Sequence, residues 1–194
     1  MGEATLEHRL SEILRGCSAL MRVLGTARAL ALPDWMVFSG AIYQPVINHL
    51  TGRPLEYGIK DYDLAYFDAS DTSYEAEDVV IRRVAAAFDE PLKSMVEVRN
   101  QARVHLWFEG KYGEPYPPLT CSAEAMGRFI TPLNSVGVRL GPDDDLQVLA
   151  PFGLEDLFAL RVRPNPAQGR AERFAQLAAN MRRRWPELTV EPAA

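Results

Sequence analysis

Cysteine and histidine are scarce in this chain, which has two cysteines and three histidines among its 194 residues. Cys17 and Cys121 stand far apart and outside any spaced set of further ligands, so the sequence does not predict a zinc site. Both lie among apolar or small residues, and we expect them to be reduced thiols of a cytoplasmic protein.

Long apolar runs, internal repeats and low-complexity segments are absent as well. No apolar stretch reaches membrane-spanning length, so the sequence predicts no membrane contact. The first residues, Met1-Gly2-Glu3-Ala4, lack a basic segment followed by an apolar run, and we expect no signal peptide. Hydrophobic residues make up 47% and charged residues 24%, which is ordinary for a globular protein. The length suits one domain that covers residues 1–194.

The formal net charge of -5 argues against a long polyanion as the main partner. The charge is unevenly distributed, however, because seven arginines and a single acid, Glu172, lie between Arg161 and Arg184. A solvated helix face is the favoured interpretation of these arginines. Binding of an RNA acceptor through them stays open but is not favoured.

Hydrophobic periodicity predicts a domain that contains both helices and strands. Helices are expected at 6–24, 42–50, 74–88, 122–130, 153–160 and 167–184, and strands at 35–38, 61–67, 95–108, 135–140 and 146–150. The last two strands should form a hairpin around the acidic turn 141–145. Residues 33–110 would then form a core, followed by the hairpin and helices of residues 119–190.

Asp61 and Asp63 fall on the same side of the predicted strand 61–67, because side chains alternate along a strand. Two carboxylates so close together repel each other, and burying them is costly unless a cation or hydrogen-bond donors lie between them. The simplest cation is Mg²⁺ (or Mn²⁺), which takes carboxylate oxygens and keeps waters and substrate phosphates as its other ligands. For an isolated Asp-x-Asp pattern, two solvated side chains are the commoner explanation. Two further stretches change this balance.

The first is Ser39-Gly40, which lies between the predicted strand 35–38 and the predicted helix 42–50. A glycine at such a junction lets a polyanion approach the backbone, and the helix start offers unpaired N–H groups and the positive end of its dipole. The serine hydroxyl adds a donor. This arrangement favours phosphate binding, although a plain turn is the commoner meaning of Ser-Gly alone.

The second is the stretch 95–108, in which apolar and polar residues alternate and only Asn100 interrupts the apolar face. Glu97, Arg99, Arg103 and His105 share the polar face. An ordinary surface strand would explain this pattern. If the polar face lines a cleft, Glu97 supplies a third carboxylate, and Arg99 and Arg103 can receive phosphate oxygens.

A triphosphate held by a glycine beside three carboxylates is what two-metal phosphoryl or nucleotidyl transfer requires. With Ser39-Gly40, Asp61, Asp63 and Glu97 in this order, the sequence resembles the polymerase-β-like nucleotidyltransferase superfamily. It is similar over nearly its whole length to a family of small bacterial nucleotidyltransferase proteins. The stretches that carry this similarity are 32–35, 39–42, 60–63, 97–107, 136–140 and 150–157.

The resemblance implies an α+β domain with a small mixed sheet and helices packed against it, that is, a polymerase-β-like nucleotidyltransferase fold with flanking N- and C-terminal helices. It also implies transfer of a nucleoside monophosphate from an NTP to an unknown hydroxyl-bearing acceptor, with release of pyrophosphate. Asp61, Asp63 and Glu97 would bind the metal ions and carry catalysis. Ser39 and Gly40 would hold the triphosphate, with Lys60, Arg99 and Arg103 as candidates for charge stabilisation.

Two features limit what the resemblance implies. The family tends to carry Arg-Asn and then Trp-Asp after the Ser-Gly, where this chain has Tyr43-Gln44 and Ile47-Asn48, so the substrate contacts of this helix stay open. Lys60 alternates to the opposite strand face from Asp61. The alternative function is a non-catalytic nucleotide-binding or regulatory module that keeps the fold, but the presence of all three carboxylates favours the enzyme. The acceptor, the base of the NTP and the oligomeric state stay open.

Overall fold

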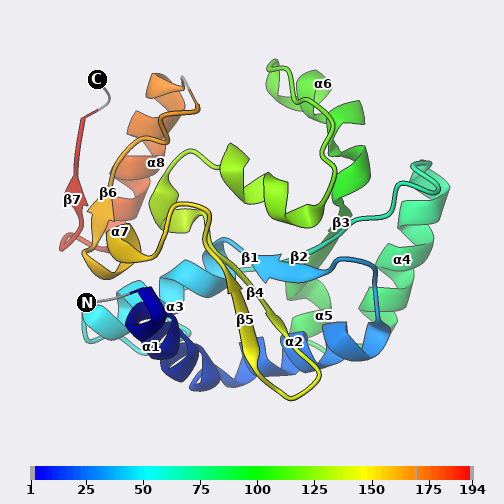
Figure 1. Cartoon of the computed structure of the whole chain (residues 1–194), viewed down its shortest axis with the longest axis horizontal. Coiled ribbons are helices and arrows are strands. Elements are labelled where there is room, and N and C mark those ends of the chain that lie inside the picture. Colours follow the sequence, from blue (N-terminus) through cyan, green and yellow to red (C-terminus); the bar gives the residue numbers. More distant parts are fainter. Residues whose placement is uncertain (1–2, 169, 193–194) are drawn as a thin grey trace.

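A five-stranded mixed sheet of order β3-β2-β1-β4-β5 runs through the middle of the protein in a computed structural model, which describes residues 3–168 and 170–192 (Figure 1). Its strands are β1 (Met36–Phe38), β2 (Tyr62–Tyr66), β3 (Val96–Asn100), β4 (Gly137–Leu140) and β5 (Leu146–Leu149). The β1 strand pairs antiparallel with β2 and β4, and β4 pairs antiparallel with β5, whereas β2 and β3 are parallel. The fold is therefore α+β with a mixed sheet, as the sequence predicted.

Helices cover one face of this sheet, below the strands in Figure 1. They are α1 (Glu3–Arg15), α2 (Ser18–Leu30), α3 (Gly40–Leu50), α4 (Tyr74–Ala86) and α5 (Leu92–Met95). The main hydrophobic core lies between this helical layer and the sheet, and it buries Tyr62, Leu64 and Val98. These residues alternate with Asp63 and Glu97 along β2 and β3, so the two carboxylates face the other side of the sheet.

The other face is partly covered by the segment that follows β3. This segment contains η1 (Gln101–Leu106), α6 (Phe108–Tyr112), η2 (Ser122–Arg128) and η3 (Pro132–Asn134). A second, smaller core of Met36, Phe38, Ala65, Leu119, Ala125 and Met126 fixes it to the sheet. The chain ends with α7 (Glu155–Phe158), β6 (Arg161–Val162), α8 (Ala171–Arg184) and β7 (Thr189–Val190), and β6 pairs parallel with β7.

Two predicted elements differ from the structure. The helix expected at 6–24 is two helices, since α1 ends at Arg15 and α2 begins at Ser18. The strand expected at 95–108 was too long, because β3 ends at Asn100 and a 3-10 helix follows. The buried Asn100 side chain causes this break: it accepts hydrogen bonds from the N–H groups of Asp68 and Ala102 and donates one to the Asp68 carbonyl.

Three further predictions need smaller corrections. The helix expected at 122–130 is the 3-10 helix η2, and the helix expected at 153–160 is reduced to α7. The helix expected at 167–184 begins at Ala171, and position 169 lies outside the described residues. The β4–β5 hairpin around the acidic turn is confirmed.

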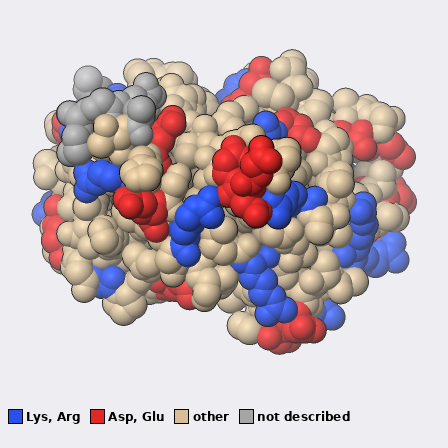
Figure 2. Space-filling model, turned by 60° about the horizontal axis from the view of Figure 1, so that its bottom comes forward, with Lys and Arg blue, Asp and Glu red and all other residues tan. Residues whose placement is uncertain are grey.

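Charged side chains of both signs are interspersed on the face turned toward the viewer in Figure 2. The acidic turn of the hairpin contributes to this mixture. Arg28 of α2 forms an ion pair with Asp144 at 2.6 Å and also donates to the Gly141 carbonyl. The turn is thus tied to the helical layer.

Candidate active site

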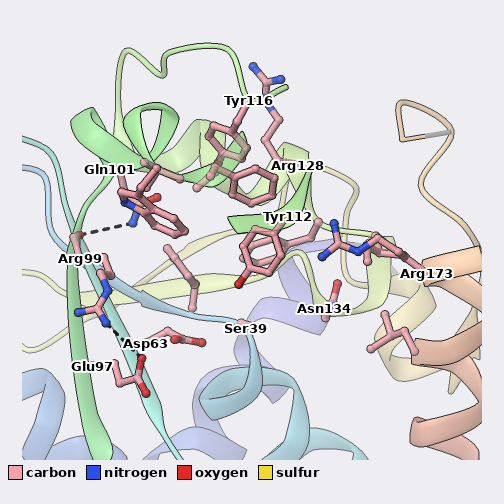
Figure 3. Close-up of a pocket in the computed structure, with 18 of the residues that line it drawn as sticks. Ser39, Asp63, Glu97, Arg99, Gln101, Tyr112, Tyr116, Arg128, Asn134 and Arg173 are labelled. Atoms are coloured by element: carbon pink, nitrogen blue, oxygen red, sulfur yellow. Dashed lines mark hydrogen bonds and ion pairs between the residues drawn. The ribbon is translucent and has the colours of Figure 1, made fainter. Parts of the chain in front are cut away.

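Asp63 and Glu97 are paired residues of the parallel strands β2 and β3. Both side chains leave the sheet on the face opposite the main core, and both line a cleft of about 390 Å³ between the sheet, the segment after β3 and α8. Figure 3 shows the two carboxylates side by side at one end of this cleft, close to Arg99 and Ser39. The structure thus brings Glu97 and Asp63 together in one cleft.

The electrostatics of this pair are unfavourable for two negative charges. Burial is the main reason that the pKa of Asp63 rises from 3.8 to about 7, and the nearby charges of Asp61 and Glu97 raise it further. The positive charge of Arg99 lowers the pKa of Asp63, but the ion pair that Arg99 forms is with Glu97, at 3.8 Å. The Asp63 carboxyl therefore lies in an acidic cluster that the protein's own cations neutralise incompletely.

Asp61 lies just before β2 and is exposed, at the start of α3 rather than inside the cleft. A Cβ atom placed on Gly40 would lie 3.9 Å from Asp61 Oδ1. Asp61 also raises the pKa of Asp63 by its charge, which shows that the two carboxylates act on one another. The acidic cluster thus reaches from the cleft to the first turn of α3.

A divalent cation suits this donor set. Within the described part of the chain, no group of three His, Cys, Asp or Glu side chains is arranged so that it could hold a metal ion. Mg²⁺ does not require such a group, because it is often bound by one or two carboxylates together with waters and substrate phosphates. A dication beside Asp63 would offset the burial of its charge and the repulsion by Asp61 and Glu97, which together raise its pKa. The residues therefore fit Mg²⁺ or Mn²⁺ without forming a closed cage.

Ser39 and Gly40 form the junction between β1 and α3. Ser39 has a positive φ of 62° and its side chain makes no capping hydrogen bond, while α3 begins at Gly40. A Cβ atom on Gly40 would lie only 2.8 Å from Gln44 Nε2, so the glycine leaves room for close packing here. Gln44 is itself 8% exposed, and its Oε1 atom has no hydrogen-bond partner among the described residues. In the first turn of α3, the N–H groups of Ile42 and Tyr43 donate to the Ser39 carbonyl. The N–H groups of Gly40 and Ala41 have no hydrogen-bond partner among the described residues, so they are available to a ligand.

Lys60 and Arg103 lie outside the cleft. Lys60 is exposed and precedes Asp61. Arg103 follows the end of β3, so it does not continue the strand face of Arg99; it forms an ion pair with the buried Glu77 and donates to the Thr72 carbonyl at 3.2 Å. His105 also does not line the cleft, and its Nδ1 atom is buried without a hydrogen-bond partner in the described chain.

Sequence reasoning missed the far wall of the cleft. Its aromatic side chains are Trp107, Phe108, Tyr112 and Tyr116, and its polar side chains include Arg128, Asn134, Arg170 and Arg173. The available signals were the Gly-, Pro- and Tyr-rich loop at 110–118 and the arginine-rich stretch from Arg161 to Arg184. Neither signal indicated that these segments, far apart in the chain, meet above the carboxylates.

Comparison with known proteins gives three findings. A family described as "Nucleotidyltransferase" matches residues 25–190. An NMR structure described as revealing "a CCA-adding enzyme head domain" superposes with a TM-score of 0.76 at 24% sequence identity, over 99% of this chain and 100% of the other. No curated protein matches the chain. In the described residues, no helix has the length and apolar character needed to cross a membrane.

Proposed function

Because the chain belongs to the nucleotidyltransferase family, we propose that it is an enzyme that moves a nucleoside monophosphate from an NTP to a hydroxyl-bearing acceptor and releases pyrophosphate. The observation that carries this proposal is the pairing of Asp63 with Glu97 in one cleft, beside the Ser39-Gly40 junction. The nucleotidyltransferase fold and the family support transfer in general.

The first turn of α3 is the proposed triphosphate site. The N–H groups of Gly40 and Ala41 and the positive end of the helix dipole attract phosphate oxygens, and the Ser39 hydroxyl adds a donor. Gly40 allows the phosphates to approach the backbone closely. Arg99, which lines the cleft, is placed to offset charge on the phosphate that is transferred.

Asp61, Asp63 and Glu97 are the residues that we propose to hold a metal ion, one or two of them together with waters and NTP phosphates, since no three such side chains form a ready-made site in the described chain. The bound metal ion would supply a positive charge that stabilises the attacking and leaving oxygens. Glu97 lies on the cleft side of the cluster and is 57% exposed, so it can accept the proton of an acceptor hydroxyl. Asp63 is deeper and is held by β2 between β1 and β3.

A second function is nucleotide binding without transfer. The ion pair between Arg99 and Glu97 favours this second function, because Arg99 then occupies the carboxylate that would accept the proton of the acceptor. The two functions predict different results in one experiment. An enzyme transfers label, whereas a binding module gains stability with NTP and Mg²⁺ but transfers nothing.

The test is incubation of the purified protein with α-labelled NTPs, Mg²⁺ or Mn²⁺ and a cell extract as a source of acceptor. The wild-type protein should transfer label, and Asp63→Asn should reduce transfer by about 100-fold or more, since it removes a proposed metal ligand. Asp143→Asn, in the exposed hairpin turn, is the matched control and should behave like the wild type. Equal labelling by wild type and Asp63→Asn would contradict the assignment of the site.

A further inference from the structure

Three aromatic side chains of the far wall lie outside both hydrophobic cores. They are Trp107, Phe108 and Tyr112, which we call the aromatic cluster. The ring centroid of Phe108 lies 4.7 Å from that of Tyr112 and 6.1 Å from that of Trp107. Among the described residues, neither core contains these three rings or has them packed against it. Tyr116, which packs against the smaller core, joins the cluster to it, since its ring centroid lies 4.5 Å from that of Phe108.

All three rings of the aromatic cluster face the cleft. The same cleft is lined by the residues of the proposed reaction centre, Ser39, Asp63, Glu97 and Arg99. Tyr112 is 41% exposed, and Figure 3 shows its ring inside the cleft with the hydroxyl group turned toward Ser39. Large rings that line a cleft and do not serve a core are typical of a site that binds a ligand.

The aromatic cluster is held in place without a ligand. Phe108 and Tyr112 are the first and last residues of α6, one helical turn apart, so they lie on the same side of that helix. Arg170 lies over Phe108 at 5.9 Å, and Arg173 lies over Tyr112 at 5.0 Å. Glu114 forms ion pairs with both arginines, at 2.7 Å and 3.1 Å, and thus joins the start of α8 to the segment after α6. A site that is formed in advance loses little conformational entropy when its ligand binds.

Size and connectivity favour the NTP as the ligand of the aromatic cluster. The cleft volume of about 390 Å³ suits one ligand of the size of a nucleotide. When the phosphates of an NTP lie at Ser39 and Asp63, its base is attached to them through a single ribose and stays in their neighbourhood. The aromatic cluster offers rings in that same cleft, and the face of a nucleobase stacks on aromatic side chains.

We infer that the aromatic cluster is the base subsite, on which the base of the NTP stacks. This inference rests on the proposed function. Stacking uses the ring face that every nucleobase has, so the cluster adds affinity for the NTP without requiring one particular base.

The test compares two ligands that differ in the base alone. ATP and ribose 5-triphosphate are bound to the wild-type protein with Mg²⁺ and without an acceptor, and both affinities are measured by calorimetry. We expect ATP to bind at least about tenfold more tightly than ribose 5-triphosphate, because only ATP has a ring that can stack.

Variants of Tyr112 identify the contact. Tyr112→Leu keeps an apolar side chain but removes the flat ring, and it should weaken ATP binding by about tenfold and leave ribose 5-triphosphate unchanged. Tyr112→Phe keeps the ring and should bind ATP like the wild type. Tyr74→Leu is the matched control, because Tyr74 is 60% exposed and does not line the cleft, and it should change neither affinity.

A second measurement does not depend on the folding of any variant. Trp107 is the one tryptophan that lines the cleft, and the other two, Trp35 and Trp185, are 8% and 1% exposed. ATP should therefore quench the tryptophan fluorescence of the wild-type protein, whereas ribose 5-triphosphate should leave it unchanged. Circular dichroism checks that the variants are folded.

Three outcomes would overturn the inference while the proposed function stands. The first is equal affinity of the wild-type protein for ATP and ribose 5-triphosphate, which would mean that the base does not contact the protein. The second is tighter binding of ATP that neither quenches tryptophan fluorescence nor responds to Tyr112→Leu, which would place the base elsewhere. The third is an equal loss of ATP binding in Tyr112→Phe and Tyr112→Leu, which would mean that the hydroxyl group, and not the ring, makes the contact. Failure of both triphosphates to bind would instead contradict the proposed function, and the inference with it.

Discussion

Asp63 and Glu97 face the same cleft from adjacent parallel strands, and the Asp63 carboxyl lies deeper in the protein than that of Glu97. Burial, together with the neighbouring negative charges, raises the pKa of the Asp63 carboxyl to about 7. A group of this kind destabilises the ligand-free protein when it is ionised and favours any cation that relieves the repulsion.

The first prediction concerns the pH dependence of stability. The folded-state pKa of Asp63 is raised from 3.8 to about 7, so its protonated form contributes stability at pH values below 4, and this contribution is lost as the pH rises through 7. Asp63→Asn removes the ionisation and should raise the melting temperature at pH 8 by roughly 5 °C, with little change at pH 4. Thermal unfolding of both proteins across this pH range is the measurement.

Mg²⁺ supplies the control for this prediction. At pH 8 it should stabilise the wild-type protein more than Asp63→Asn, because a ligand of the native state stabilises it by mass action. Asp143→Asn, in the exposed hairpin turn, should keep the wild-type pH profile. A wild-type profile for Asp63→Asn would mean that the carboxyl is not under electrostatic strain.

The second prediction concerns the start of α3. In Gly40→Ala the new methyl group would meet Gln44 Nε2 at 2.8 Å and displace a flexible side chain, while the helical backbone accepts alanine. We expect a melting temperature within a few degrees of the wild type and an increase of about tenfold in KM for the NTP, because phosphates can no longer approach the backbone closely.

The double variant Gly40→Ala/Gln44→Ala separates two causes of such an effect. If the methyl group blocks the phosphates, the KM stays high in the double variant. If the displaced Gln44 side chain is the cause, removal of that side chain should restore the wild-type value. An unchanged KM in Gly40→Ala would exclude a phosphate contact at this junction.

The third prediction concerns the end of β3. The Asn100 side chain bonds the Asp68 N–H, the Asp68 carbonyl and the Ala102 N–H, and the Asn100 N–H donates to Glu77 Oε1 at 2.9 Å. Asn100→Ala leaves buried backbone groups unpaired and should lower the free energy of unfolding by about 2–3 kcal/mol. Urea denaturation measures this loss, and Asn180→Ala, on the exposed face of α8, should change stability by less than about 0.5 kcal/mol. A similarly small change for Asn100→Ala would show that these hydrogen bonds do not hold the end of the strand.

The same residue shows how far the sequence could predict the site. The alternation of apolar and polar residues correctly placed Glu97 and Arg99 on one strand face, because this pattern depends only on local geometry. The pattern continues to Phe108, but the Asn100 hydrogen bonds to Asp68 end the strand first. These hydrogen bonds join segments that are distant in sequence, so local periodicity does not predict them. The one sign of them within the stretch is that the polar Asn100 interrupts its apolar face.

The far wall of the cleft could not be predicted for a similar reason. Tyr116 and Arg173 line one cleft although they belong to a loop and to α8, and only tertiary packing brings them together. The pairing of Asp63 with Glu97 required the parallel register of β2 and β3, which periodicity within each strand does not define. Local spacing in the sequence was thus enough to select the carboxylates as candidates. It was not enough to predict that the aromatic and arginine side chains of the far wall lie across the cleft from them.

The fourth prediction concerns the arginines at the end of α8, for which a solvated helix face is the interpretation that we favour from the sequence. Arg182 and Arg183 are exposed, whereas Arg184 packs over Trp185 at 4.3 Å and donates to the Tyr57 carbonyl at 2.9 Å. The combined variant Arg182→Gln/Arg183→Gln should therefore leave the melting temperature within about 2 °C of the wild type and leave label transfer unchanged. Arg184→Gln loses a packed contact and should lower stability by about 1 kcal/mol.

Binding to a fluorescent single-stranded RNA at increasing salt distinguishes this solvated face from an RNA-binding one. If α8 bound an RNA acceptor, each arginine on a phosphate would contribute to the salt slope, and the double variant would reduce that slope by about 1.4. We expect no such change, because these exposed side chains lie outside the cleft in which the acceptor must meet Glu97. A reduced slope together with lower label transfer would instead assign the acceptor to a polymer that crosses α8.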